Sequence, residues 1–199
     1  MTKLYEFELV FALPEGEHDP FEISDNILEA GVGDPLIGTG NLPLISVELE
    51  VEDEDPESAI LGAARAIIAR LPDGSLLREV RPDLVSLADV ANKLKVKRQA
   101  LQKREMPLPT MGGFYRVDEI YLILAKACEP GVGKRRARFD LNLARSWFEA
   151  GIAARQVNAR LTTHQLDPVR LVVQTSSPMT ASMPAYIAAQ QTGSVARAD

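Results

Sequence analysis

Six long hydrogen-bond donors lie close together in the middle of the chain, with no acid among them before Glu105. They are Lys97, Arg98, Gln99, Gln102, Lys103 and Arg104. Arginine can bridge two acceptors of guanine and glutamine can bridge adenine, whereas lysine suits a phosphate. We therefore interpret this run as the outward surface of a helix that contacts double-stranded DNA.

A preceding helix is needed to position these donors, and the sequence predicts one. Ser86, followed three residues later by Asp89, fits a helix cap. The inward face would consist of four apolar residues, Leu87, Val90, Ala91 and Leu94.

Lys95 and Val96 then occupy a turn, and a second helix is predicted from Arg98 to Arg104. Its inward residues would be Ala100 and Leu101. Two short helices joined by a tight turn are typical of the helix-turn-helix.

A hairpin and a third helix are predicted after this pair. Gly112 and Gly113 indicate the tip of the hairpin. Tyr115 and Arg116 then lead into a helix from Asp118 to Ala127. The hairpin would form a small wing beside the two helices.

The segment from Ser86 to Ala127 resembles the winged helix-turn-helix of MerR, excisionase and AlpA-like regulators. There, a helix pair similar to LADVANKLKVKRQALQK precedes a Pro-flanked wing and a closing helix. The resemblance implies base or phosphate contacts by Arg98, Gln99, Gln102 and Lys103, and a wing contact by Arg116. The family usually has Gly in the turn and Ser at the start of the second helix, where this chain has Lys95 and Lys97. Together with its acidic YEFELVF-type N-terminal domain, the chain also resembles an uncharacterised group of bacterial DNA-binding proteins.

Charge is distributed unevenly along the chain, whose net charge is -6. Residues 1–82 hold 5 basic and 18 acidic residues, whereas residues 83–128 carry a net charge of +3 and residues 129–199 carry +4. The acidic segment would repel phosphates and the other two could attract them. Any DNA contact is therefore expected in the middle and C-terminal parts of the chain.

A second basic group follows the predicted helix-turn-helix. Its members are Lys134, Arg135, Arg136 and Arg138. The neighbouring Gly-Lys pair does not make a Walker loop, because Arg135 stands where that loop needs Ser or Thr. These residues either contact phosphates beside the helix-turn-helix or form an exposed linker.

The N-terminal part is predicted to be a ferredoxin-like split βαβ domain of the α+β class. Period-two alternation of apolar residues predicts strands at residues 5–11 and 45–51, and shorter strands are expected at 36–39 and 76–81. Helical spacing predicts helices at 19–30 and 56–71. The order strand, helix, strand, strand, helix, strand is that of an antiparallel sheet covered on one face by two helices.

The C-terminal part is predicted to hold one long helix, from Asp140 to Thr162, with Asp140 as its cap and Gly151 as an interruption. Residues 169–173 could form a strand, and 176–199 are expected to be a mobile tail. The predicted organisation is an acidic domain at 1–82, the winged helix-turn-helix at 83–128, a basic loop with helix and strand at 129–175, and the tail.

Several classes of function have little support in the residue pattern. The single cysteine, Cys128, and the two histidines offer no metal-ligand spacing or nucleophile motif. We therefore expect no metal, no cofactor and no catalytic activity. The absence of a long apolar run and of a signal-like start predicts a cytoplasmic protein with no membrane contact.

The predicted function is sequence-specific binding of double-stranded DNA by a dimeric transcriptional regulator. The split βαβ domain or the Leu143 to Leu161 helix would hold the homodimer together, and an inverted repeat would be its operator. Two alternatives remain. The protein could be an antitoxin-like or adaptor protein whose acidic domain binds a basic partner, or a regulator whose N-terminal domain senses a ligand.

Overall fold

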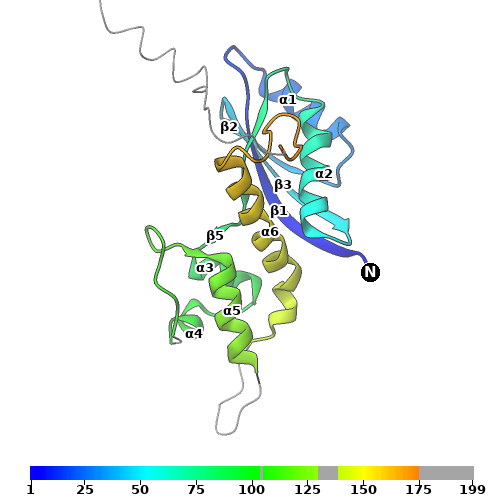
Figure 1. Cartoon of the computed structure of the whole chain (residues 1–199). Coiled ribbons are helices and arrows are strands. Elements are labelled where there is room, and N and C mark those ends of the chain that lie inside the picture. Colours follow the sequence, from blue (N-terminus) through cyan, green and yellow to red (C-terminus); the bar gives the residue numbers. More distant parts are fainter. Residues whose placement is uncertain (104, 130–138, 175–199) are drawn as a thin grey trace, which may run out of the picture.

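A four-stranded antiparallel sheet forms the first part of the molecule (Figure 1). The structure, a computed structural model, describes residues 1–103, 105–129 and 139–174. The strands are β1 (Lys3–Ala12), β2 (Leu36–Asn41), β3 (Leu44–Asp53) and β4 (Leu76–Arg81), and their order in the sheet is β2-β3-β1-β4. Every neighbouring pair is antiparallel. The predicted α+β class is confirmed at this level, and each of the four predicted strands is present.

Alternation along β1 gives the sheet one apolar and one acidic face. Tyr5, Phe7, Leu9 and Phe11 are buried in a hydrophobic cluster. The residues between them point to the opposite face, where Glu6 lies opposite Glu50 and Glu8 lies opposite Glu48 on β3. These glutamates of β1 and β3 therefore lie on the face of the sheet that the hydrophobic cluster does not use.

Two helices belonging to this part begin at aspartate caps. In α1 (Pro20–Glu29) the Asp19 carboxylate accepts a hydrogen bond from the Phe21 N–H at 2.9 Å. In α2 (Pro56–Ile68) Asp55 accepts one from the Ser58 N–H at 2.8 Å. The second helix ends three residues before the predicted Leu71, although Leu71 is still buried in the cluster. We call β1 to β4 with α1 and α2 the sheet lobe.

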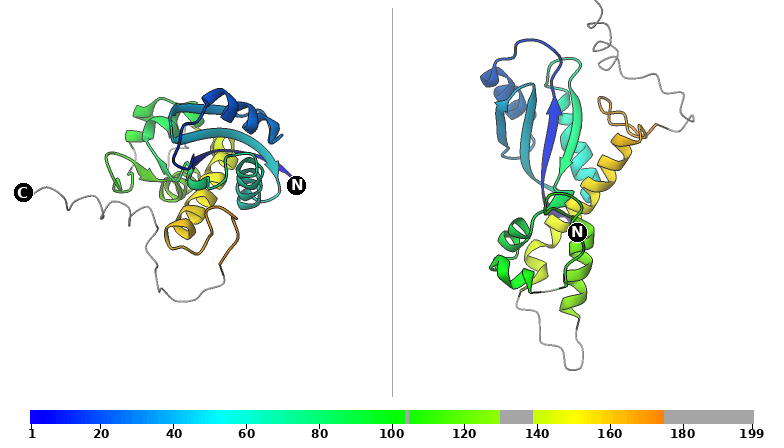
Figure 2. Two further views of the ribbon diagram at one scale, coloured as in Figure 1. Left: turned by 90° about the horizontal axis from the view of Figure 1, so that it is seen from above. Right: turned by 90° about the vertical axis from the view of Figure 1, so that its left-hand side faces the viewer.

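The second part is built from short helices around a separate hydrophobic cluster. Its elements are β5 (Leu84–Val85), α3 (Leu87–Lys93), α4 (Arg98–Gln102), β6 (Tyr115–Arg116) and α5 (Val117–Cys128). β5 and β6 pair with each other and so join the two ends of this segment. We call it the helical lobe; Figure 2 shows it below the sheet lobe in its right-hand view.

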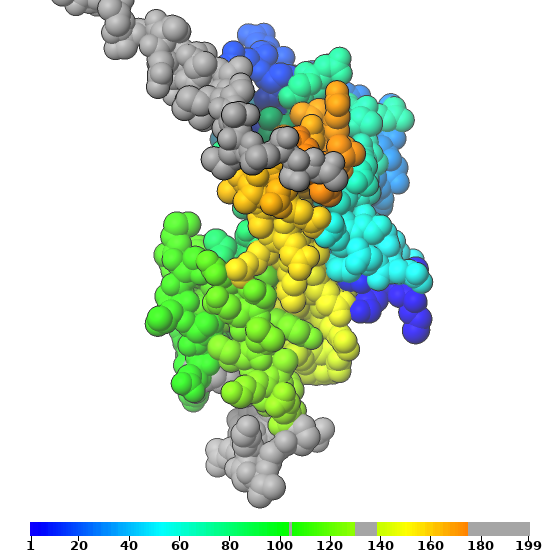
Figure 3. Space-filling model, viewed as in Figure 1, coloured from blue at the N-terminus to red at the C-terminus, as the bar shows by residue number. Residues whose placement is uncertain are grey.

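One long helix, α6 (Arg145–Thr162), joins the two lobes. Ala150, Ala153, Ala154 and Val157 enter the cluster of the sheet lobe, whereas Trp147 and Phe148 enter that of the helical lobe. In Figure 3 the yellow surface of α6 lies between the green helical lobe and the cyan residues of the sheet lobe. Its apolar stripe is therefore used inside the molecule, so this stripe is not available for the dimer contact that the sequence suggested.

The start and the middle of α6 differ from the prediction. Asp140 caps a short 3-10 helix, Leu141–Ala144, through the Asn142 N–H at 3.0 Å, and α6 begins only after it. The helix also runs through Gly151 without interruption. A Cβ at Gly151 would lie 2.6 Å from the carbonyl oxygen of Pro82 and 2.8 Å from a methyl group of Val117. Glycine is thus required there by close packing, and does not break the helix.

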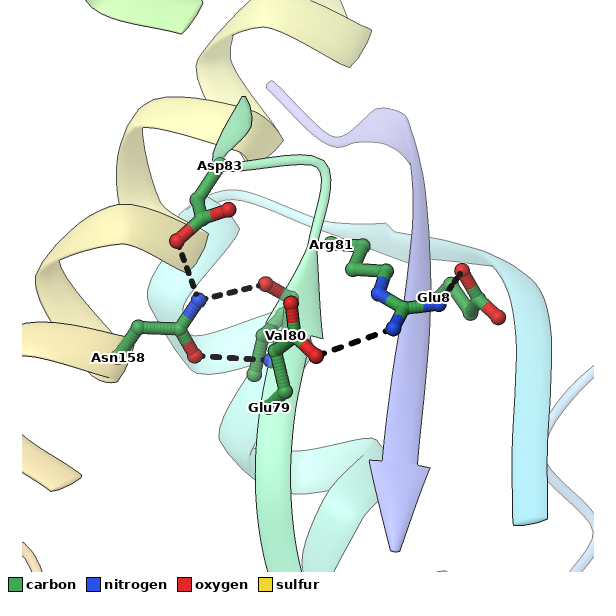
Figure 4. Close-up of polar contacts among 6 residues, drawn as sticks. All are labelled: Glu8, Glu79, Val80, Arg81, Asp83 and Asn158. Carbon is green, nitrogen blue, oxygen red and sulfur yellow. Dashed lines mark hydrogen bonds and ion pairs between the residues drawn. The ribbon is translucent and has the colours of Figure 1, made fainter. Parts of the chain in front are cut away.

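The last part of α6 and the segment after it cover the outer edge of β4. The Leu77 N–H donates to the Pro168 carbonyl at 2.8 Å. The Asn158 side chain accepts from the Val80 N–H and donates to the Val80 carbonyl, both at 2.8 Å (Figure 4). The prediction of a strand at 169–173 is wrong, because this segment forms only an isolated bridge between Leu166 and Val173. The predicted tail, 176–199, lies outside the described residues.

Two further observations concern the described residues only. None of their helices is both long and apolar enough to cross a bilayer. Among the same residues, no group of three or more His, Cys, Asp or Glu side chains lies together in a way that could hold a metal ion.

Candidate nucleic-acid interface

The first helix of the predicted motif, α3, is held by a capping box. The Ser86 hydroxyl accepts hydrogen bonds from the N–H groups of Ala88 and Asp89 at 3.2 Å each. The Asp89 carboxylate accepts in return from the Ser86 N–H at 2.8 Å. The four predicted inward residues, Leu87, Val90, Ala91 and Leu94, are buried, as the sequence predicted.

The turn between α3 and α4 has the hydrogen bonds of a Schellman motif. The Val96 N–H donates to the Ala91 carbonyl at 2.9 Å, and the Lys95 N–H donates to the Asn92 carbonyl at 3.1 Å. Lys95 has a φ of 54°, in the left-handed region that favours glycine. A lysine therefore occupies a left-handed position that favours glycine, and the chain still makes the turn.

The second helix, α4, is a short element anchored by one residue. Leu101 is fully buried, whereas Ala100 is exposed. The prediction that Ala100 points inward is therefore wrong, because five residues complete little more than one turn and place a single side chain over the core. Lys97 is the N-cap residue and its side chain makes no capping hydrogen bond.

The remaining side chains of this helix and its flanks are exposed to solvent. They are Lys97, Arg98, Gln99, Gln102 and Lys103. Within the described part of the chain, none of these five side chains makes a hydrogen bond or an ion pair. Arg98 and Gln102 are four residues apart and Gln99 and Gln102 three, so they are neighbours on the helix surface. The structure thus places five of the predicted contact residues on one small exposed surface, which we call the α4 surface.

The turn adds a cation to this surface that was not among the predicted contacts. Lys95 is exposed and, within residues 1–103, 105–129 and 139–174, its side chain has no hydrogen-bond or ion-pair partner. Its place in the sequence, two residues before the donor run, was a usable signal.

The predicted hairpin is present, and it is largely apolar. The Thr110 N–H donates to the Phe114 carbonyl and the Phe114 N–H to the Met111 carbonyl, both at 2.8 Å. Gly112 and Gly113 form the tip with φ values of 54° and 84°. The side chains of Leu108, Met111 and Phe114 are exposed. In Figure 1 the green segment that leads to this hairpin lies on the same side of the helical lobe as α4.

Arg116, the predicted wing contact, lies at the base of this hairpin. It is exposed, and its guanidinium lies 3.8 Å from the carboxylate of Glu119. An exposed pair at this distance contributes little to stability. The side chain is therefore available to a ligand, although it is less free than the cations of the α4 surface.

Two other cations are engaged in ion pairs between separate elements of the molecule, and one of them, Lys93, joins the two lobes. Lys93 pairs with Glu6 of β1, and Arg160 pairs with Glu57 of α2. The hydrogen bond with Glu57 raises the pKa of Arg160. Lys93 also lies 5.8 Å from the centre of the Trp147 ring. These residues are part of the structure of the molecule and were not among the predicted contacts.

The remaining predicted contact residues, Arg104, Lys134, Arg135, Arg136 and Arg138, lie outside the described residues. Comparisons of the chain with protein-family models, with curated proteins and with solved structures found no match.

Proposed function

We propose that the protein is a non-enzymatic, sequence-specific binder of double-stranded DNA that acts as a transcriptional regulator in the cytoplasm. The observation that carries this proposal is the α4 surface, on which cations and amides without internal partners stand together. Side chains that are buried or paired within the protein have no donors left for a ligand, whereas unpaired cations and amides do. Here they are presented to solvent beside a turn and a hairpin.

The order of elements supports a finer description of each lobe. The strand order β2-β3-β1-β4, with all pairs antiparallel, is the one expected for a ferredoxin-like split βαβ domain. The succession β5, α3, turn, α4, hairpin, β6 and α5 is the one expected for a winged helix-turn-helix. We propose both assignments on this basis.

Each contact follows from the chemistry of its side chain. Arg98 and Gln99, at the start of α4, would read base edges in a major groove. Lys97 and Lys103, with Lys95 of the turn, would bind phosphates and fix the register of the protein on the duplex. A helix as short as α4 reaches few base pairs, so useful specificity would require two copies of the chain on two half-sites.

The acidic face of the sheet limits how DNA can approach. Glu48, Glu50 and Glu52 are exposed on β3, and within the described part of the chain none of them pairs with a cation. A duplex that approached this face would be repelled. The α4 surface is therefore the side of the molecule on which DNA would dock.

The test is fluorescence anisotropy of the full chain with DNA from its own upstream region and with unrelated DNA, at several salt concentrations. In the variant Arg98→Ala/Gln99→Ala we expect affinity for the specific sequence to fall more than ~10-fold, since each lost base contact costs about 1–3 kcal/mol. The logarithm of the binding constant should decrease with the logarithm of salt by about 0.9 per phosphate contact.

The matched control is Arg78→Ala/Gln156→Ala. It also removes one arginine and one glutamine, both exposed, but away from the α4 surface. We expect this variant to bind as the unaltered protein does. The proposal would be abandoned if the unaltered protein showed no binding, or if both double variants bound equally well.

A second candidate function is capture of a basic protein partner by the sheet lobe. It is favoured by Glu48, Glu50 and Glu52, which are exposed on β3 and pair with no cation among the described residues. A stoichiometric basic partner that no longer binds Glu48→Gln/Glu50→Gln, with DNA affinity unchanged, would support this candidate.

A further inference from the structure

The two edges of the sheet differ in whether their outward-facing backbone groups are hydrogen-bonded. At the β4 edge, Pro168 and Asn158 satisfy the backbone groups of Leu77 and Val80. At the β2 edge, no described residue makes a hydrogen bond to the outward-facing backbone groups. An unpaired strand edge is a template for another strand unless charge, proline or a covering segment blocks it. β2 contains neither a charged residue nor a proline.

Exposed apolar side chains accompany this bare edge. Leu36 of β2 is 70% exposed, and on the adjacent α1 Phe21 is 81% and Leu28 53% exposed. Ile37, the neighbour of Leu36, packs against the core, so Leu36 points to the opposite face of the sheet. Figure 2 shows α1 at the β2 end of the sheet, far from α6. Apolar surface therefore lies at this end of the sheet and on α1 beside it.

We infer that the β2 edge, with Phe21 and Leu28 of α1, is the surface through which two copies of the chain form a dimer. An antiparallel strand edge is complementary to itself, because a two-fold axis brings each N–H opposite a carbonyl of the second copy. An uncharged strand can meet its own copy without placing like charges opposite each other. The alternative dimer contact, the apolar stripe of α6, is already buried within the molecule.

The size of this contact fits a small specific interface. Two Phe21 rings contribute on the order of 300 Å² of aromatic surface. Four leucines and two strand edges bring the total to the order of 1,000 Å² that such an interface needs. The register of β2 against β3 shifts between Gly38 and Asn41, so only Leu36 to Gly38 is regular. The apolar side chains, more than the strand pairing, would therefore supply the affinity.

Charge near the contact gives the dimer a distinctive salt dependence. Glu22 and Asp25 are exposed on α1, and each would approach its counterpart in the second copy. Salt screens this repulsion. Dimerisation should therefore strengthen with salt, whereas binding of phosphates weakens. The inference does not depend on DNA binding, and its test uses no DNA.

The test is sedimentation equilibrium of the full chain, combined with hydrogen exchange of the β2 amides. We expect a monomer-dimer equilibrium in which β2 exchange slows as the dimer forms. In Phe21→Glu/Leu28→Gln the dissociation constant should rise at least ~10-fold, as is usual when central apolar residues of an interface are lost. Leu36→Lys should act in the same direction, because a lysine on an edge strand opposes pairing.

The matched control is Leu122→Glu/Leu143→Gln, which alters two leucines that are 65% and 57% exposed outside the sheet lobe. We expect it to dimerise normally. The inference is overturned if the unaltered chain is a monomer at every concentration, or if its dimer survives both edge variants. If the chain is a monomer and its β2 amides are still protected from hydrogen exchange, another segment of the same chain covers the edge. This outcome would also overturn the inference.

Discussion

The sheet lobe and the α4 surface use their basic residues in opposite ways. Of the five cations in residues 1–82, four bind an acid or a backbone carbonyl. They are Lys3, Arg65, Arg70 and Arg81, and only Arg78 has no partner among the described residues. Around α4, by contrast, Lys95, Lys97, Arg98 and Lys103 all lack partners within the same part of the chain.

This difference separates residues that maintain the structure from residues that are free to bind. Ion pairs such as Lys93 with Glu6 connect the lobes, yet half-exposed pairs contribute only modestly to stability. The main connection is the packing of α6 against both clusters. The comparison therefore predicts that changes at this junction affect folding strongly, whereas changes on the α4 surface affect ligand binding and little else.

The largest effect is expected from Gly151→Ala at the junction. The new Cβ would lie 2.6 Å from the Pro82 carbonyl oxygen and 2.8 Å from Val117, so backbone has to move. We expect the free energy of unfolding to fall by about 3 kcal/mol, at the upper end for overpacked sites. Urea denaturation followed by circular dichroism measures it.

Gly62→Ala is the matched control for this substitution. Gly62 lies inside α2, where an added Cβ has no neighbour within 4 Å. Alanine there should stabilise the protein by about 0.5–1 kcal/mol, because glycine is a poor helix former. If both variants shifted the midpoint equally, the lobes would not be connected by close packing at Gly151.

A smaller loss is expected from Asn158→Ala at the capped sheet edge. The substitution leaves the Val80 N–H and carbonyl without their partner and removes the hydrogen bond to Asp83, which is 2.9 Å long (Figure 4). Unsatisfied buried groups cost about 1–3 kcal/mol, so we expect a loss of about 2 kcal/mol.

Hydrogen exchange of the Val80 amide gives a local measurement of the same effect. This amide should exchange faster in Asn158→Ala and at the normal rate in Gln156→Ala, which removes an exposed amide from the same helix. Unchanged exchange in both variants would show that the Asn158 side chain does not close the β4 edge.

Local patterns in the sequence were enough to predict much of both lobes. Alternation from Tyr5 to Phe11 correctly predicted β1 and its buried face, because a strand repeats every two residues. The cap at Ser86 and the apolar spacing after it correctly predicted α3 and its inward side chains. The exposed donors of α4 followed from the same periodicity.

The features that sequence could not reveal depend on contacts between distant residues. Gly151 looked like an interruption because its neighbours, Pro82 and Val117, are far away in the sequence. Asn158 is an unremarkable polar residue until α6 lies beside β4. The apolar stripe of α6 predicted a buried face, but not that this face is shared between two clusters.

A smaller effect than that of Asn158→Ala, and of opposite sign, is expected from Lys95→Gly in the turn. Lys95 has a positive φ of 54°, and glycine adopts this conformation without the steric cost that Cβ imposes. We expect the free energy of unfolding to rise by about 1 kcal/mol in urea denaturation. In Lys126→Gly, within the last turn of α5, glycine should instead destabilise the protein by a similar amount.

The same variant, although more stable, should bind DNA less tightly. Lys95→Gly removes one free cation of the α4 surface, so the salt dependence of binding should lose about one phosphate contact. A more stable protein that binds DNA less tightly would show that this lysine is kept for its charge despite its backbone strain. A stable variant with unchanged affinity and salt dependence would remove Lys95 from the interface and leave the donors of α4 to bind alone.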